Sequence, residues 1–132
     1  MIINVTPDKE KARSMLNLAA KREEFASSIN SSQFPTMAAE NYYEIVKELS
    51  SAILLAEGIK TTGENAHKET ISEMSRHGMA DSEISIMDDL RMKRNKSSYE
   101  GKEIDISYLK NRKGELLAII SKLKSILTKR LN

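Results

Sequence analysis

Hydrophobic residues recur at intervals of three and four along most of the chain, which is the spacing of one buried helix face. The pattern predicts five helices joined by polar turns. We expect them over residues 6–30, 36–57 and 65–77, from 81 to an end between 96 and 99, and from 105 or 107 to 131. No segment shows convincing alternation of apolar and polar residues, so no strand is predicted. The sequence therefore predicts an all-α, up-and-down bundle of about five helices, in one domain covering residues 1–132.

The predicted helix ends carry local signals. Thr6 followed by Pro7 predicts a hydroxyl N-cap and a proline at the first helical position. Gly58 and Gly78 follow the second and third helices, as glycine often does at a helix C-terminus. Gly114 lies inside the fifth helix, where glycine costs about 1 kcal/mol relative to alanine. We therefore expect a bend or a close helix contact at Gly114.

The apolar residues are unevenly distributed among the predicted helices. Leu54 and Leu55 widen the apolar stripe of the second helix, which predicts a central position for it. The third helix has few apolar residues and is expected at the periphery. The second and fifth helices carry more apolar residues than a small five-helix core requires, and a surplus apolar face on a protein often marks a partner surface. We therefore expect a homodimer.

Composition limits the chemistry that the chain can carry. The 21 basic and 19 acidic residues leave a net charge of only +2, so any anion binding must come from local clustering. The absence of cysteine excludes disulfides and thiolate zinc sites. No apolar run approaches the roughly 18 residues that suggest a membrane span, and no signal peptide is recognisable. We expect a cytoplasmic protein.

The one dense charge cluster places four cations within six residues, Arg91 to Lys96. In a helix, Arg91, Arg94, Asn95 and Ser98 share one face, next to the apolar positions that precede them. The guanidinium fork of arginine suits phosphate, so this face is a candidate for gripping a phosphate backbone. The alternative is a solvated C-terminal turn, in which Asp88 and Asp89 pair with the neighbouring cations.

The same segment resembles the signature of HEPN domains, which are small helical bundles. The family motif is an arginine and a histidine separated by four to six residues, the first of which is usually polar, such as asparagine. Here Arg94 and Asn95 match its start, and an aromatic residue and Gly101 follow in the turn. The resemblance covers most of the chain in its order of helices, but only residues 91–101 are specific.

The resemblance implies a homodimer in which two copies of the motif face a shared cleft. In active members the arginine and histidine cleave RNA without a metal ion. Many members are toxins paired with a minimal nucleotidyltransferase antitoxin, and others bind nucleotides or act as helical interaction modules. Carried onto this chain, the catalytic candidates are Arg94, Asn95 and Tyr99. The candidates for contacting RNA or nucleotide phosphate are Arg91, Lys93, Lys96 and Ser98.

The chain departs from the HEPN pattern at the histidine position, which is occupied by Tyr99. Histidine titrates near neutral pH and serves as both base and acid, whereas an ordinary phenol with a pKa of about 10 is a poor base. Tyr99 would either activate a ribose hydroxyl with help from Arg94, donate a hydrogen bond to the scissile phosphate, or simply pack its ring and anchor the turn. RNA cleavage and a catalytically inactive dimeric scaffold both remain open.

The remaining candidates indicate no further chemistry. His67 and His77 lack the three- or four-residue spacing of metal ligands on a helix, and both are expected at the surface or at helix ends. Tyr42 and Tyr43 are candidates for stacking on a base. The alternative, which we expect for at least one of them, is packing in the core. No glycine-rich phosphate loop is present. We expect no metal ion and no cofactor.

Overall fold

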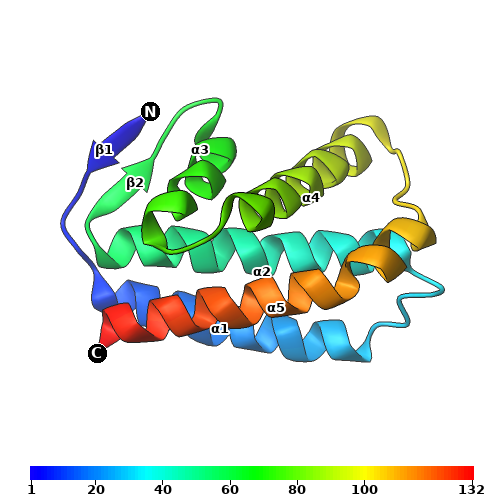
Figure 1. Cartoon of the computed structure of the whole chain (residues 1–132), viewed down its shortest axis with the longest axis horizontal. Helices are drawn as coiled ribbons and strands as arrows, with labels where there is room; N and C mark the ends of the chain where they lie inside the picture. The colour runs from blue at the N-terminus through cyan, green and yellow to red at the C-terminus, as the bar shows by residue number, and fades with distance from the viewer.

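The computed structural model describes residues 1–132 as a bundle of helices with a small two-stranded sheet at one end (Figure 1). The helices are α1 (Lys9–Ser28), α2 (Pro35–Ala56), α3 (Ala66–Glu73), α4 (Asp81–Glu100) and α5 (Ile106–Leu131). The short elements are strands β1 (Ile2–Asn4) and β2 (Ile59–Thr61) and the 3₁₀ turn η1 (Met74–His77). The four long helices run alternately up and down (Figure 1), so the predicted all-α bundle is confirmed. None of the helices combines the length and apolar composition needed to cross a membrane.

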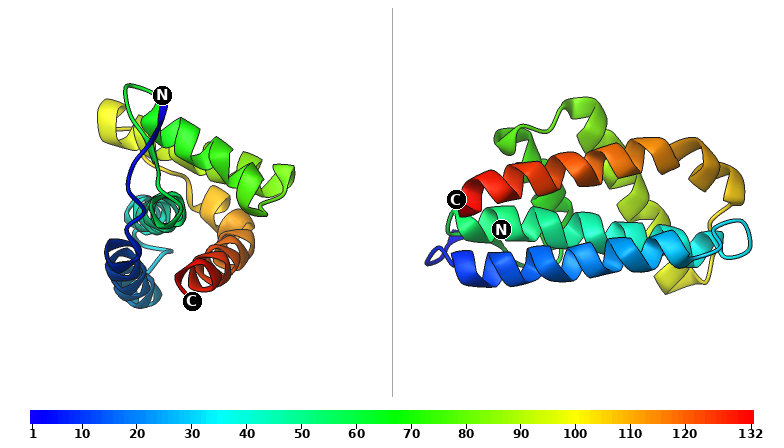
Figure 2. Two further views of the ribbon diagram at one scale, coloured as in Figure 1. Left: turned by 90° about the vertical axis from the view of Figure 1, so that its left-hand side faces the viewer. Right: turned by 90° about the horizontal axis from the view of Figure 1, so that it is seen from below.

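Helix α2 lies at the centre of the bundle, as its broad apolar pattern predicted. Figure 2 shows it between α1 and α5 on one side and α3 and α4 on the other. Its buried hydrophobic residues are Ala38, Ala39, Tyr42, Tyr43, Ile45, Val46, Leu49, Ala52, Ile53, Leu54 and Ala56. They surround most of the helix, so its apolar surplus is covered within a single chain. The apolar residues of α2 therefore give no reason to expect a homodimer.

The N-terminal segment is extended and attaches to the end of α2, which corrects the predicted start of the first helix. Asp8, rather than Thr6, caps α1 with its side chain, and Pro7 lies outside the helix. The Val5 amide donates a hydrogen bond to the carbonyl oxygen of Gly58 at 2.8 Å. Because of this tertiary contact, the chain stays extended through Thr6 and Pro7, the residues whose sequence signals a helix start.

A two-stranded antiparallel sheet fastens the two segments further, with Ile2 opposite Thr61. It was not predicted, because strands of three residues are too short for alternation to be recognised. Gly58 connects α2 to β2 with a φ of +77°, and a Cβ at this position would lie 2.6 Å from the carbonyl oxygen of Val5. The close approach of the two segments therefore depends on glycine at this position.

The third helical segment covers the predicted residues, but it changes from an α-helix to a 3₁₀ turn before its end. Helix α3 gives way to η1 at Met74, and Gly78 ends that turn with a φ of +104°. Ile71 and Met74 are fully buried, so the segment covers one side of the core. His77 was expected at the surface or a helix end; it closes η1 but is buried, with its Nδ1 3.6 Å from a carboxylate oxygen of Glu57.

A glycine in the left-handed conformation ends α4 before the linker to α5. Helix α4 continues to Glu100, just beyond the predicted range, and Gly101 has a φ of +66°. Asp105 caps α5 by accepting a hydrogen bond from the Ser107 amide at 3.2 Å. Gly114 lies within the uninterrupted α5, and a Cβ there would meet no atom within 4 Å. The close helix contact expected at Gly114 is therefore wrong.

Candidate functional site

The basic run lies in the C-terminal half of α4, where the row of residues facing α2 changes from apolar to charged. Met87 and Leu90 in this row are fully buried. Arg94 follows Leu90 by four residues and so lies on the same side of the helix. Its side chain is only 24% exposed, which agrees with a polar face beside the core.

Two residues of α2 hold the Arg94 guanidinium. Its central carbon lies 5.3 Å from the ring centroid of Tyr43, within the range of a cation–π contact. Its Nη2 lies 3.4 Å from Oε1 of Glu44, whose other oxygen contacts the ammonium of Lys47 at 2.9 Å. The guanidinium is thus oriented by a ring and by one long contact to a carboxylate that it shares with a lysine.

Both tyrosines of α2 belong to the core, so neither ring is open to an RNA base. Tyr42 is 3% exposed and Tyr43 is fully buried. Burial raises the pKa of Tyr43 to about 12; the nearby Glu44 acts in the same direction, while the Arg94 and Arg91 cations oppose the rise. The hydroxyl of Tyr43 has no hydrogen-bond partner. Tyr43 therefore acts as a neutral surface under Arg94.

The remaining cations of the run diverge. Arg91 donates to Oδ1 of Asp88 at 2.8 Å, as the solvated-turn alternative predicted for one of the two aspartates. Lys93 extends to the other side of α4, where its ammonium lies 5.1 Å from the ring centroid of Tyr108 on α5. Four cations that are adjacent in sequence are therefore spread around the helix, and three of them contact other side chains of the protein.

The end of α4 carries the exposed candidates. Tyr99 is 79% exposed and makes no hydrogen bond, so its ring neither packs nor anchors the turn. Lys96 and Ser98 are also exposed, and Asn95 is half-buried. These four side chains are open to a partner, whereas Arg94 and Arg91 are held against the bundle. The structure thus divides the seven sequence-predicted site residues into an anchored group and an exposed group.

One residue that the sequence did not connect with the basic run lies near it. Burial lowers the pKa of His67, at the start of α3, and the Lys47, Arg94 and Arg91 cations lower it further, against an opposing effect of Glu44. The imidazole is therefore neutral at pH 7 and able to accept a proton. Sequence analysis looked for a histidine after Arg94 along the chain, and only the packing of α3 beside α2 and α4 brings His67 to this region.

The charges of this region are nearly balanced. Arg91, Arg94 and Lys47 face the carboxylates of Asp88 and Glu44. A phosphate group that contacts either arginine would therefore compete with a carboxylate for the guanidinium. Comparisons of the chain with protein-family models, with curated proteins and with solved structures find no match. The HEPN resemblance remains a prediction that rests on residues 91–101.

Proposed function

We propose that the protein is a HEPN-like RNA-binding protein whose α4 contacts the phosphate backbone through Arg94 and Arg91. The observation that carries the proposal is the placement of Arg94: an arginine fixed over Tyr43 at the edge of the core, one helical turn from Arg91. A fixed, planar guanidinium fork is suited to donating two parallel hydrogen bonds to the oxygens of a phosphate. The exposed Lys96 and Ser98 would extend the contact toward the end of the helix.

The carboxylates around the arginines do not prevent RNA binding. Partly exposed ion pairs such as Arg94 with Glu44 are worth about 0–1 kcal/mol. A phosphate accepts two parallel hydrogen bonds from a guanidinium, which makes it the stronger partner for Arg94. Binding therefore exchanges one long carboxylate contact for a phosphate contact, and Glu44 keeps Lys47 as its counter-ion.

The exposed position of Tyr99 favours binding over cleavage. An endoribonuclease that works without a metal ion needs a base positioned at the ribose hydroxyl and an acid for the leaving oxygen. No hydrogen bond fixes the hydroxyl of Tyr99, while the imidazole of His67 is neutral and its pKa is lowered by burial and by the Lys47, Arg94 and Arg91 cations. Any cleavage by this chain would use Arg94 and Asn95 together with either Tyr99 or His67.

The direct test is the affinity for a single-stranded RNA oligonucleotide, measured by fluorescence anisotropy over a range of salt concentrations. We expect Arg94→Ala to abolish or strongly weaken binding and to reduce the salt dependence by about one phosphate contact. Arg112→Ala is the matched control, because Arg112 is an arginine of α5 paired with Glu115 at 2.9 Å. Equal affinity of Arg94→Ala and wild type, with both shown to be folded by circular dichroism, would contradict the proposal.

A cleavage assay in the presence of a chelator separates binding from catalysis. If the scaffold is a HEPN active site that lacks only its base, Tyr99→His should gain RNA cleavage. His67→Ala should remove any residual cleavage by the wild type if His67 serves as the base. No cleavage by either the wild type or Tyr99→His would leave RNA binding as the function.

A second candidate function is a catalytically inactive dimeric scaffold, and exposed apolar side chains favour it. Phe25, Phe34 and Met37 are 61%, 46% and 58% exposed. They lie at the end of α1, in the connecting turn and at the start of α2, at the end of the bundle where α4 also ends (Figure 1). This surface, with Tyr99, would join two copies or hold a minimal nucleotidyltransferase partner, the type of antitoxin that the HEPN resemblance implies.

Solution mass and co-purification test the scaffold function. Light scattering should give the mass of two chains, and Phe34→Ser together with Met37→Ser should give one. Co-purification with a nucleotidyltransferase-like protein would support the toxin-type partnership. A monomeric wild type that purifies alone from its native extract would contradict the scaffold. Calorimetry with nucleotides separates a scaffold from a nucleotide-binding module.

A further inference from the structure

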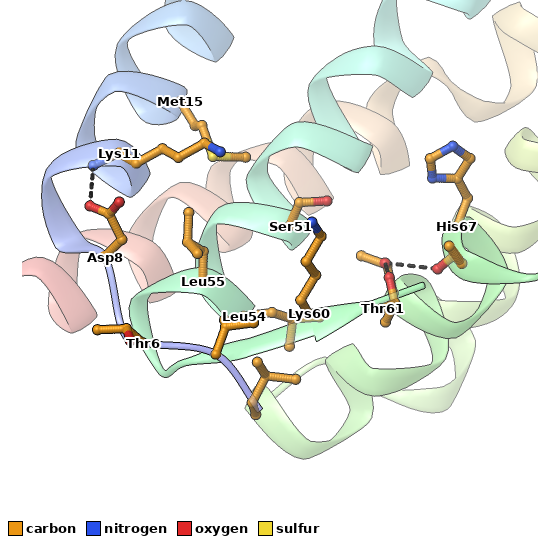
Figure 3. A pocket seen from close by; sticks show the side chains of 14 residues that line it. Thr6, Asp8, Lys11, Met15, Ser51, Leu54, Leu55, Lys60, Thr61 and His67 are labelled. Carbon is orange, nitrogen blue, oxygen red and sulfur yellow. Dashed lines mark hydrogen bonds between the residues drawn. The ribbon is translucent and has the colours of Figure 1, made fainter. Parts of the chain in front are cut away.

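A cavity of about 370 Å³ lies where the N-terminal segment, α1, the end of α2, β2 and the start of α3 meet (Figure 3). Its volume falls within the range of about 300–1,000 Å³ that is typical of small-molecule sites. The walls are fixed by backbone hydrogen bonds, from Val5 to Gly58 at 2.8 Å and from Asp8 to Leu55 at 3.1 Å. The cavity is thus a preformed feature of the fold.

One part of the lining is aliphatic. Leu54, Leu55 and Ile59 contribute from α2 and β2, and Met15 contributes from α1. No phenylalanine, tyrosine or tryptophan lines the cavity, so it offers none of the aromatic rings on which nucleotide bases usually stack. This lining suits a short aliphatic group, whose burial is favourable in proportion to the apolar area removed from water.

The rim is basic. The side chains of Lys11, Lys60 and His67 come from three sides of the cavity (Figure 3). The chain contains eleven ion pairs, and neither Lys11 nor Lys60 takes part in any of them. The carboxylate of Asp8 accepts a hydrogen bond from the Lys11 amide at 2.9 Å and is thereby engaged in capping α1.

We infer that this cavity binds an amphipathic organic anion with a short aliphatic body and a single carboxylate or phosphate head. The body would lie against Leu54 and Leu55, and the head would lie between Lys11 and Lys60. The imidazole of His67 is available as a hydrogen-bond donor or acceptor for the head. Lys11 and Lys60, which would hold the head, are not part of the proposed RNA site, and His67 is the one residue that both proposals use.

The test is a titration of the ¹⁵N-labelled protein with octanoate and with octyl phosphate, followed by NMR. We expect saturable shifts of the amides of Thr61 and Ala66 with at least one of the two. A response to octanoate alone identifies a carboxylate head, and a response to octyl phosphate alone identifies a phosphate head. Lys11→Ala and Lys60→Ala should each weaken binding about tenfold, the loss of one charge-assisted contact. Lys21→Ala should not change it, because Lys21 is an exposed lysine of α1 outside the cavity.

Two control probes define outcomes that would overturn the inference: 1-octanol, which lacks a charged head, and inorganic phosphate, which lacks the aliphatic body. If 1-octanol binds as well as octanoate and octyl phosphate, the cavity does not recognise an anion. If inorganic phosphate binds as well as octyl phosphate, the aliphatic lining plays no part. Absence of shifts with both anions, shifts confined to another surface, or equal affinities of both lysine variants and the wild type would also contradict it.

Discussion

The α4 face and the cavity rim use their cations differently. On α4, Arg91 and Arg94 each contact a carboxylate and Lys93 lies over a tyrosine ring, although the four cations are almost consecutive in sequence. At the rim, Lys11 and Lys60 are far apart in sequence and neither forms an ion pair. A helix turns successive side chains to different sides, where each meets different partners from its own helix or from a neighbouring one. The density of cations in a sequence therefore does not measure the positive charge that a ligand meets.

The largest effect should come from the connection that builds the cavity. Gly58→Ala forces a Cβ into a φ of +77° and to within 2.6 Å of the Val5 carbonyl oxygen. We expect a loss of at least about 1–3 kcal/mol in the free energy of unfolding, measured with urea. Gly114→Ala is the matched control, because its Cβ would meet nothing and helix propensity should increase stability by about 1 kcal/mol. An equal response of both variants would contradict the described junction.

The support beneath Arg94 can be tested at alkaline pH. The folded-state pKa of Tyr43 is raised to about 12, mainly by burial, so the protonated phenol stabilises the fold below pH 10. This stabilisation is lost as the pH rises from about 10 through about 12. Tyr43→Phe should reduce the alkaline loss of stability and, by removing an unpartnered buried hydroxyl, raise stability at pH 7 by up to about 1 kcal/mol.

Tyr99→Phe is the matched control for the Tyr43 variant. Its ring is 79% exposed, so the same chemical change should leave the stability at pH 7 unaltered. If Tyr99→Phe and Tyr43→Phe shift the urea midpoint equally, Tyr43 is not the buried surface described under Arg94.

Removing the carboxylate beside Arg94 should sharpen the contrast between the two regions. Glu44→Gln takes away the competitor of the incoming phosphate, so RNA affinity should rise by about two- to fivefold, as expected for an exchangeable ion pair. Binding of octanoate or octyl phosphate in the cavity should not change. Anisotropy and NMR titrations of the same variant measure both, and unchanged or weaker RNA binding would contradict the exchange of carboxylate for phosphate.

Sequence patterns predicted the parts of the fold that repeat over many residues. The five helices and the central position of α2 followed from periodicity, and capping chemistry limited the start of α5 to residue 105 or 107. The three-residue strands and the delayed start of α1 did not, because they depend on a tertiary contact between Val5 and Gly58.

The candidate site was predicted less completely than the fold. Helical spacing correctly placed Arg91 and Arg94 on a face beside the core. It could not show that Lys93 turns toward α5, that Tyr99 is exposed, or that His67 lies near Arg94. These outcomes depend on which elements pack against α4, and no local pattern in the sequence encodes that packing.

The smallest expected effect concerns His67. Burial, followed by the cations Lys47, Arg94 and Arg91, lowers its pKa, so the neutral imidazole stabilises the fold above pH of about 6.5. That contribution is lost as the pH falls through the lowered pKa. An NMR titration should show the lowered value in the wild type and an upward change in Arg94→Gln. An unchanged value would place His67 away from the α4 face.

The most direct measurement for RNA binding follows the side-chain Nε–Hε signals of the arginines during titration with a single-stranded RNA oligonucleotide. The proposal predicts that Arg94 and Arg91 shift in a saturable manner, because phosphate replaces Glu44 and Asp88 as their partner. The signal of Arg112 on α5 should stay in place. Shifts of Arg112 as large as those of Arg94, or no shift of Arg94 at saturating RNA, would contradict the central claim.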